Sequence, residues 1–375
     1  MSKLTISAFI SLLGLMGCVP CGLAASSQPT VQLTTDPPIE KARPADEPIR
    51  LTLQAVDDDK KPLQNAKLRL QIFTPAKTPW FSTDFPVVEG TQLLDMEAIA
   101  PTGKLEVQQV MPIRGKYQLV VNVTPLAANK FTPTQQTLTF SVPENPVKYR
   151  NFAILAAILF GVGLGGGWVI AGSQKLQPGE IAPERVRLLL SGATLVAIAT
   201  LLFVNITAEL ADSHEQHHHS REDDAAVRPS SQEQVRWLGD DHATVGQLAQ
   251  MAVQLTDANI GQNAKDVVIK VKATQMEHNE TVFAYQGVPD ANGKLMWRQQ
   301  FFDGATHKLE VEVSPQPGAA RQFQPFKVSK EIEVDGVAPP LHVRFLSLAY
   351  FTGILVVGLL LGLKLKQVSL APAKD

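Results

Sequence analysis

The chain has 375 residues, enough for two or three domains, and its 34 basic and 36 acidic side chains nearly balance. This balance lacks the strongly basic character of nucleic-acid-binding proteins, so no nucleic-acid partner is expected. Hydrophobic residues make up 45% of the chain, and they gather in a few long apolar runs that separate polar segments.

The first apolar run has the form of an export signal. Lys3 precedes an apolar stretch that ends in small residues, which predicts a signal peptide over residues 1–25. Both cysteines, Cys18 and Cys21, lie inside it, so the mature chain would contain no thiol. Lipidation at Cys18 is the alternative to cleavage, although Met16 stands where a lipobox usually has a smaller residue.

Three further runs are uncharged and long enough to cross a hydrocarbon layer of about 30 Å as helices. We expect a multi-pass membrane protein in contact with the lipid bilayer, with both large polar segments on the outer, periplasmic side. The predicted spans are 152–171, 188–208 and 345–363, with a cytoplasmic loop at 172–187 and a cytoplasmic tail at 364–375.

The two outer segments are copies of one another. Residues 103–125 align without a gap on residues 293–315, and eight of these 23 positions are identical. The tetrapeptide QNAK occurs upstream in both copies, and each copy runs into an apolar span. The unit of outer domain plus membrane helix is therefore used twice, with 188–208 returning the chain to the outer side.

Apolar residues alternate with polar ones in short runs, as in Leu51, Leu53 and Ala55. This period of two predicts half-buried antiparallel strands, six or seven in each copy. The segment from Gly115 has the form Gly-x-Tyr-x-Leu-x-Val, which is typical of a late sandwich strand with Tyr117 at a tyrosine corner. The predicted fold class is all-β, with two immunoglobulin-like β-sandwiches at 26–145 and 239–337, plus three transmembrane α-helices.

The pattern VxDxxxxPLxNAKLxLxI followed by GKYxLxVxVxP resembles the YtkA-like and FixH-like modules of bacterial envelope proteins, and more distantly the CopC-type copper-resistance sandwiches. The resemblance implies an exported or membrane-tethered sandwich, associated in several cases with copper or cytochrome-oxidase assembly. The first sandwich contains no histidine, so no copper ligand of these families can be placed on it.

A histidine-rich, acidic linker is predicted at 209–238. Imidazoles with nearby carboxylates suit copper or zinc, and such tracts are a compositional signal of metal binding. A solvated linker without a rigid cage is the competing interpretation. No cofactor is required by either interpretation, and the candidate ligands are His214, His217, His218 and His219.

The second sandwich holds further soft and imidazole donors, Met276, His278 and His307. His307 stands where the first copy has Tyr117, and its alternative role is a strand-end ring that bonds a backbone carbonyl. In the first sandwich, a Pro-rich loop carries Trp80, Phe81 and Phe85. These aromatic residues predict either a partner-binding surface or a flap that closes one end of the sandwich.

Glycines recur four residues apart in the first and third predicted helices. This spacing lets helix backbones approach closely, and it predicts either packing of these helices together or a homodimer. The pairs are Gly161 with Gly165, Gly163 with Gly167, and Gly358 with Gly362.

No nucleophile elbow, Walker loop, zinc-protease motif or dinucleotide fingerprint occurs in the sequence, so an enzyme is not expected. The sequence favours a non-catalytic envelope protein whose duplicated domains bind or scaffold a partner, such as another membrane complex. A copper-handling accessory factor that uses the histidine-rich linker is the alternative.

Overall fold

The computed structural model describes residues 29–172 apart from 79 and 128–130, residues 183, 186–188 and 191–192, and residues 233–370 apart from 258–265 and 320–322. The predicted signal peptide, nearly all of the predicted span 188–208 and the four clustered histidines lie outside the described residues.

The first copy forms seven strands and one long helix. Buried and more exposed side chains alternate along β2, β3 and β6, as the period-two pattern predicts. The elements are β1 (Thr30–Asp36), β2 (Ile49–Val56), β3 (Ala66–Phe73), β4 (Gln92–Ala100), β5 (Lys104–Gln109), β6 (Gly115–Pro125), β7 (Thr134–Val142) and α1 (Pro146–Ile170).

The second copy repeats this order and adds the short strand β9. Its elements are β8 (Glu233–Gly239), β9 (His242–Thr244), β10 (Leu248–Asp257), β11 (Val267–Gln275), β12 (Glu280–Gly287), β13 (Lys294–Gln300), β14 (His307–Pro315), β15 (Phe326–Asp335) and α3 (Leu341–Leu370).

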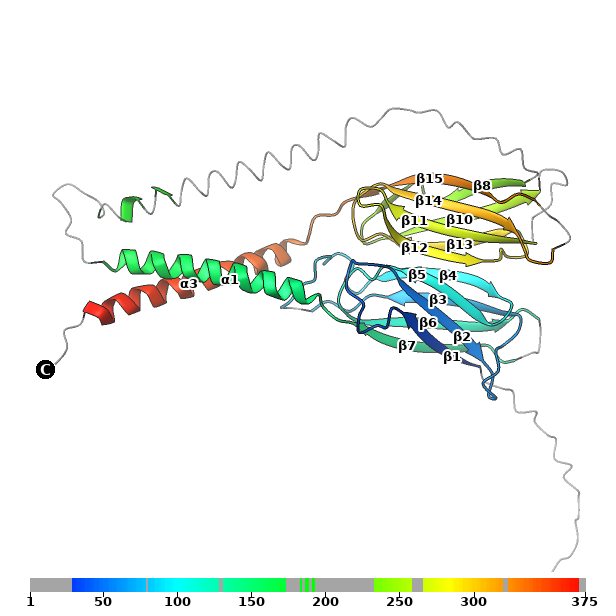
Figure 1. The fold of residues 1–375 in the computed structure, drawn as a ribbon, viewed down its shortest axis with the longest axis horizontal. Coiled ribbons are helices and arrows are strands. Elements are labelled where there is room, and N and C mark those ends of the chain that lie inside the picture. The colour runs from blue at the N-terminus through cyan, green and yellow to red at the C-terminus, as the bar shows by residue number, and fades with distance from the viewer. Residues whose placement is uncertain are drawn as a thin grey trace, which may run out of the picture.

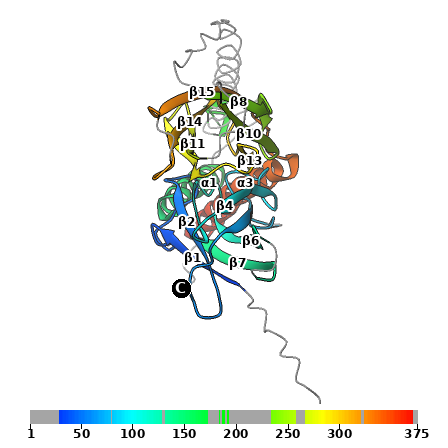
Figure 2. The same ribbon diagram turned by 90° about the vertical axis from the view of Figure 1, so that its right-hand side faces the viewer.

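The strands form two sheets that face each other, and both sheets run through both copies (Figures 1 and 2). The eight-stranded sheet has the order β1-β2-β5-β12-β11-β14-β15-β9, and the seven-stranded sheet has the order β7-β6-β3-β4-β13-β10-β8. The sequence predicts two separate sandwiches, whereas here the sheets continue across the boundary between the copies. We call these two sheets together the β-body.

The boundary between the copies is reciprocal. Strand β5 pairs with β12, while β4 pairs with β13, and β13 is the repeat equivalent of β5. Val107 lies opposite Tyr285, and Trp297, which the sequence repeat aligns with Val107, lies opposite Met96. The same surface of each copy therefore meets its counterpart, as in an isologous dimer interface.

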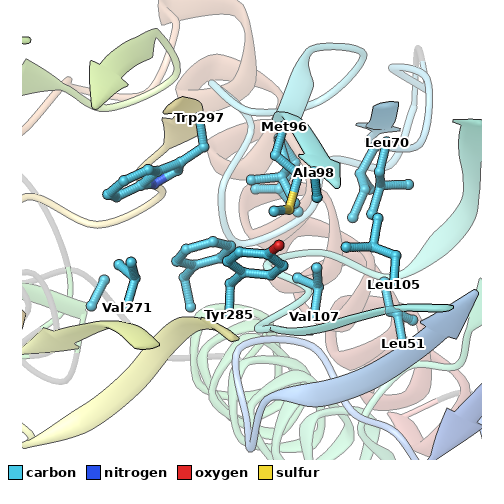
Figure 3. Packing of buried hydrophobic residues seen from close by; sticks show 14 of the residues in the cluster. Leu51, Leu70, Met96, Ala98, Leu105, Val107, Val271, Tyr285 and Trp297 are labelled. Atoms are coloured by element: carbon cyan, nitrogen blue, oxygen red, sulfur yellow. The ribbon is translucent and has the colours of Figure 1, made fainter. Parts of the chain in front are cut away.

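The buried apolar side chains form one cluster that includes residues of both copies. Figure 3 shows Tyr285 and Trp297 of the second copy together with Met96 and Val107 of the first. The ring of Trp297 stacks on Phe283 with centroids 6.0 Å apart. Because this core continues across the boundary, separating the copies would expose it to water.

Helices α1 and α3 lie side by side at one end of the β-body (Figure 1). Pro146–Ile170 and Leu341–Lys366 are both long and apolar enough to cross a membrane. Asn145 caps the start of α1, because its side chain accepts a hydrogen bond from the Val147 N–H, and Pro146 occupies the first helical turn.

Candidate functional site at the helix-proximal end of the β-body

The connection between β3 and β4, residues 74–91, lies where the β-body meets the helices. We call it the aromatic loop, because it carries Trp80, Phe81 and Phe85. Thr74 fixes its base: the Thr74 hydroxyl lies 2.6 Å from the Val88 carbonyl oxygen, and the Thr91 N–H donates to Thr74 Oγ1 at 2.9 Å.

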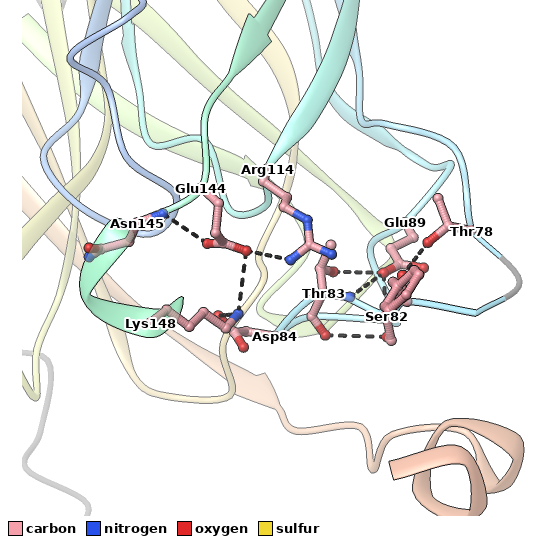
Figure 4. Close-up of polar contacts among 10 residues, drawn as sticks. Thr78, Ser82, Thr83, Asp84, Glu89, Arg114, Glu144, Asn145 and Lys148 are labelled. Atoms are coloured by element: carbon pink, nitrogen blue, oxygen red, sulfur yellow. Dashed lines mark hydrogen bonds and ion pairs between the residues drawn. The ribbon is translucent and has the colours of Figure 1, made fainter. Parts of the chain in front are cut away.

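A buried carboxylate shapes the far half of the loop. Glu89 is only 5% exposed, and its Oε1 accepts hydrogen bonds from the backbone N–H and the hydroxyl of Thr83, both at 2.7 Å. Ser82 Oγ lies 3.4 Å from the same oxygen (Figure 4). These bonds satisfy the Oε1 oxygen of Glu89 and hold the segment before Phe85 in a fixed turn.

A second set of charges ties the loop to α1. Glu144 accepts from the Arg114 guanidinium and, at 3.0 Å, from the Asn145 N–H. Lys148 pairs with Asp84 of the loop and lies 3.8 Å from Glu144 (Figure 4). Burial alone would raise the pKa of Glu144, but the bonds from Arg114 and Asn145 and the charge of Lys148 outweigh it and lower the pKa.

The tip of the aromatic loop contacts α3. The ring of Phe81 stacks on Tyr350 with centroids 6.2 Å apart and planes 5° apart. The Tyr350 hydroxyl donates to the Trp80 carbonyl at 2.8 Å, and the Thr78 hydroxyl donates to the Phe81 carbonyl. The side chains of Trp80 and Phe81 nevertheless remain 66% and 65% exposed.

Phe85 has a different environment from the other two aromatic residues. It packs edge-on against Phe302 of the second copy, with centroids 5.2 Å apart, and it belongs to the margin of the apolar cluster. The loop thus contributes one aromatic side chain to the contact between the copies and presents two to the surroundings.

A surface cavity of about 670 Å³ opens beside the loop. Its lining mixes apolar side chains with polar ones, and the polar ones include Glu89, Arg114, Lys116, Glu144 and Tyr149. Arg114 and Glu144 neutralise each other within it. The geometry suits a structural ion-pair network that fixes the loop and α1 to the β-body.

The candidate metal ligands of the second copy differ in their surroundings. His307 is 2% exposed, its ring centroid lies 4.6 Å from that of Phe301, and its Nδ1 lies 2.9 Å from the Ala305 carbonyl oxygen. Burial lowers the pKa of His307. Met276 and His278 are exposed beyond the end of β11, and no cluster of three or more His, Cys, Asp or Glu able to hold a metal occurs among the described residues.

The helix contact uses one of the two glycine pairs of α1. A Cβ on Gly163 or Gly167 would clash with the backbone of α3 at Leu355 or Leu359. Gly161 and Gly165 have no such neighbour on α3. The pair of α1 that packs on α3 is therefore Gly163 with Gly167, and the expectation that Gly161 and Gly165 take part in this contact is wrong.

Gly358 and Gly362 lie against α1 in the reciprocal arrangement. A Cβ on Gly358 would clash with the Phe160 carbonyl, and one on Gly362 with the Leu164 carbonyl. The four glycines that face the partner helix therefore bring the two backbones into direct contact.

Sequence patterns did not indicate one charged group at the boundary between the copies. Asp95 on β4 is 5% exposed and binds Arg69 through both carboxylate oxygens at 2.9 Å. Arg298 of β13 donates to Asp95 Oδ2 at 2.7 Å. The pairing of Asp95 with Arg298 depends on β4 and β13 being neighbours, which no local pattern in the sequence reveals.

No protein-family profile matches the chain, and no match was found among curated proteins. Solved structures with some similarity to the chain include the cohesin module of a Clostridium perfringens family 33 glycoside hydrolase, at 9% identity and a TM-score of 0.21, covering 29% of this chain and 100% of that one. The Yersinia pseudotuberculosis adhesin InvE has 11% identity and a TM-score of 0.19, covering 80% of this chain and 58% of its own. Invasin, a bacterial integrin-binding protein, has 10% identity and a TM-score of 0.20, covering 83% of this chain and 40% of its own.

Proposed function

We propose that this chain is a non-catalytic, membrane-anchored envelope protein whose β-body binds a strand of a partner protein and so scaffolds a membrane complex. The two apolar helices would anchor it, together with the predicted span 188–208. Both copies of the β-body would then stand on the outer, periplasmic side of that membrane.

The observation that carries the proposal is the difference between two equivalent edge strands. β7 pairs on one side with β6, and β15 pairs in the equivalent way with β14. β15 contains five charged residues and is partly covered by β9. β7 spans nine residues, TQQTLTFSV, without a charge or a proline, and it ends the seven-stranded sheet.

Proteins usually protect a free sheet edge with charges, proline, bulges or a covering segment, because unpaired N–H and C=O groups bind added strands. The second copy has such protection, whereas β7 has neither charge nor proline and is not covered by any strand of the described part of the chain. An extended segment of a partner can pair with β7 through main-chain hydrogen bonds, as in β-strand addition.

The neighbouring edge of the other sheet is partly occupied by a side chain. Gln136 of β7 accepts from the Val31 N–H at 2.7 Å and donates to the Val31 carbonyl at 3.3 Å. The amide thereby occupies main-chain groups at the edge of β1. This leaves the β7 main chain as the favoured site for an incoming strand at this end of the β-body.

The test compares two double variants of the full chain, purified from its own membranes in mild detergent. Thr137→Lys with Thr139→Lys places two charges at exposed positions of β7, while Thr137→Val with Thr139→Val is the matched uncharged control. We expect the wild type and the Val variant to elute as a complex with a second protein, and the Lys variant to elute without it. Equal mass and composition for all three would overturn the proposal.

The copper-handling alternative is tested on the full chain too, because a fragment starting at residue 209 would leave β12 and β13 without their neighbours β5 and β4. The protein is titrated with Cu(II), Cu(I) and Zn(II), and so is a variant with the four clustered histidines changed to alanine. Sub-micromolar binding that the variant loses would favour metal handling, whereas weak and equal binding of all three ions would favour the scaffold.

A further inference from the structure

The helices themselves mark where a bilayer would lie. Arg344 and Lys364 are 20 residues apart in α3, which corresponds to about 30 Å at the rise of an α-helix and matches a hydrocarbon core. At the end of this segment that is farther from the β-body, Lys366 Nζ lies 4.8 Å from the centroid of the Trp168 ring of α1. A tryptophan and a lysine at this level are typical of a membrane interface.

The tip of the aromatic loop extends past the level of Arg344, where the hydrocarbon core would begin. Tyr350 is six residues past Arg344 in α3, about 9 Å deeper along the helix axis. Phe81 stacks on this tyrosine, and the Trp80 carbonyl accepts from its hydroxyl. The loop therefore descends beside α3 to the level of its apolar segment.

The charges of the loop fit the same boundary. No charged residue occurs between Lys77 and Asp84, and Asp84 pairs with Lys148 at the start of α1. Lys77 lines a small hollow together with Pro340 and His342 at the start of α3. The charged residues that flank the tip are therefore near the outer ends of the helices, while the uncharged tip lies deeper. Long and flanking charged side chains commonly occupy this position at the edge of a bilayer.

The tip also meets a requirement that lipid imposes on backbone groups. A carbonyl without a hydrogen bond is costly in hydrocarbon, where water cannot replace the missing donor. The Trp80 carbonyl accepts from Tyr350, and the Phe81 carbonyl accepts from Thr78. Both carbonyls of the aromatic dipeptide are therefore satisfied while its side chains point to the surroundings.

From these observations we infer that the tip of the aromatic loop, residues 78 and 80–83, inserts into the outer leaflet of the bilayer beside α3, with Trp80 and Phe81 in contact with lipid acyl chains. The inference rests on the membrane anchorage in the proposed function. It assigns the exposed aromatic pair to a lipid surface in place of a protein partner. Insertion would fix the distance and tilt of the β-body, and hence of the β7 edge, relative to the membrane.

The experiment uses tryptophan fluorescence of the full chain in phosphatidylcholine vesicles whose acyl chains carry bromine at a shallow or a deep carbon. Trp168→Phe leaves Trp80 as the reporter, and Trp80→Phe leaves Trp168 as the reporter of helix insertion. The variant with both changes gives the background from Trp237 and Trp297 of the β-body. Phenylalanine preserves apolar character at both positions, and the Trp80 carbonyl can still accept from Tyr350.

We expect the Trp168→Phe protein to lose more emission than the background variant, with the greater loss from bromine at the shallow carbon. The opposite outcome is that quenching of the Trp168→Phe protein equals that of the background variant while the Trp80→Phe protein is quenched through Trp168. In that case the helices are inserted but the loop is not, and the inference is overturned. A protein partner would then be the occupant to seek. If neither reporter is quenched, the anchorage itself fails, which is a separate result.

Discussion

Gln299 Nε2 lies 3.3 Å from Gln109 Oε1, and these two buried glutamines are equivalent residues of the two copies. Each also donates to the carbonyl of its next residue: Gln109 to Val110 at 2.9 Å, and Gln299 to Gln300 at 3.2 Å. The pair marks the centre of the reciprocal boundary. A slip of β5 or β13 would separate the two amides and leave Gln109 Oε1 buried without its donor, so the contact penalises other registers.

We predict that Gln299→Leu destabilises the full chain by about 1–3 kcal/mol, because Gln109 Oε1 would be left buried without its donor. Changing both glutamines to leucine should cost less than the sum of the two single changes, because the orphaned partner is also removed. Guanidinium unfolding in detergent micelles measures the three variants. Strict additivity would show that the two amides do not interact.

A second prediction concerns Asp95, the buried carboxyl at the boundary between the copies, and the dependence of stability on pH. Burial alone would raise the pKa of Asp95, but the hydrogen bond and charge of Arg69 and the charge of Arg298 outweigh it, so the pKa is lowered. A carboxyl with a lowered folded-state pKa stabilises the fold above its unfolded value near 3.8, and this contribution is lost as the pH falls through the folded value. Asp95→Asn should therefore cost about 2 kcal/mol at pH 7.

The same variant should approach the wild type in stability when both are unfolded well below pH 4. Unfolding curves across pH 2.5 to 7 provide the measurement. A gap between Asp95→Asn and the wild type that stays constant over this range would mean that the ion pairs at the boundary add nothing to stability.

The helix contact allows a matched comparison within one helix. Gly163→Ala should weaken packing by about 1–3 kcal/mol, because its new methyl group meets the Leu355 carbonyl and forces the backbones apart. Gly165→Ala should be tolerated, because no atom of the described residues lies within 4 Å of a Cβ at that position. Thermal unfolding of the full chain in nanodiscs compares the two, and an equal loss from both would contradict the observed helix contact.

His307 provides a test at milder pH. Burial lowers its pKa, so the folded state keeps the ring neutral while the unfolded chain gains a proton as the pH falls below 6.5. The wild type should thus lose stability from pH 7 toward pH 5, and His307→Asn, whose amide can still donate to the Ala305 carbonyl, should lose less. Parallel slopes for both proteins would show that another group controls this range.

The sequence repeat and the alternation of apolar residues were sufficient to predict a duplicated, strand-built protein with long apolar helices. The corner tyrosine was also predictable, since Tyr117 bonds to the backbone of Ile113 at 2.6 and 3.0 Å as its motif suggests. For His307, the sequence left a metal ligand and a carbonyl-bonded ring as alternatives. The neighbouring Phe301 and the Ala305 carbonyl, which tertiary structure supplies, favour the second.

Local patterns are properties of single elements: side-chain burial in a strand depends on its own period, and a helix depends on its own apolar length. The sequence by itself therefore determined the strands, their buried faces and the long apolar helices. The continuity of the sheets, the pairing of Asp95 with Arg298, the choice of Gly163 over Gly161 and the position of Phe81 beside Tyr350 all join residues far apart in the chain. Only the tertiary structure decided them. The free energy of such a contact depends on two segments that are distant in sequence, and the pattern of one segment does not show which other segment it will pack against.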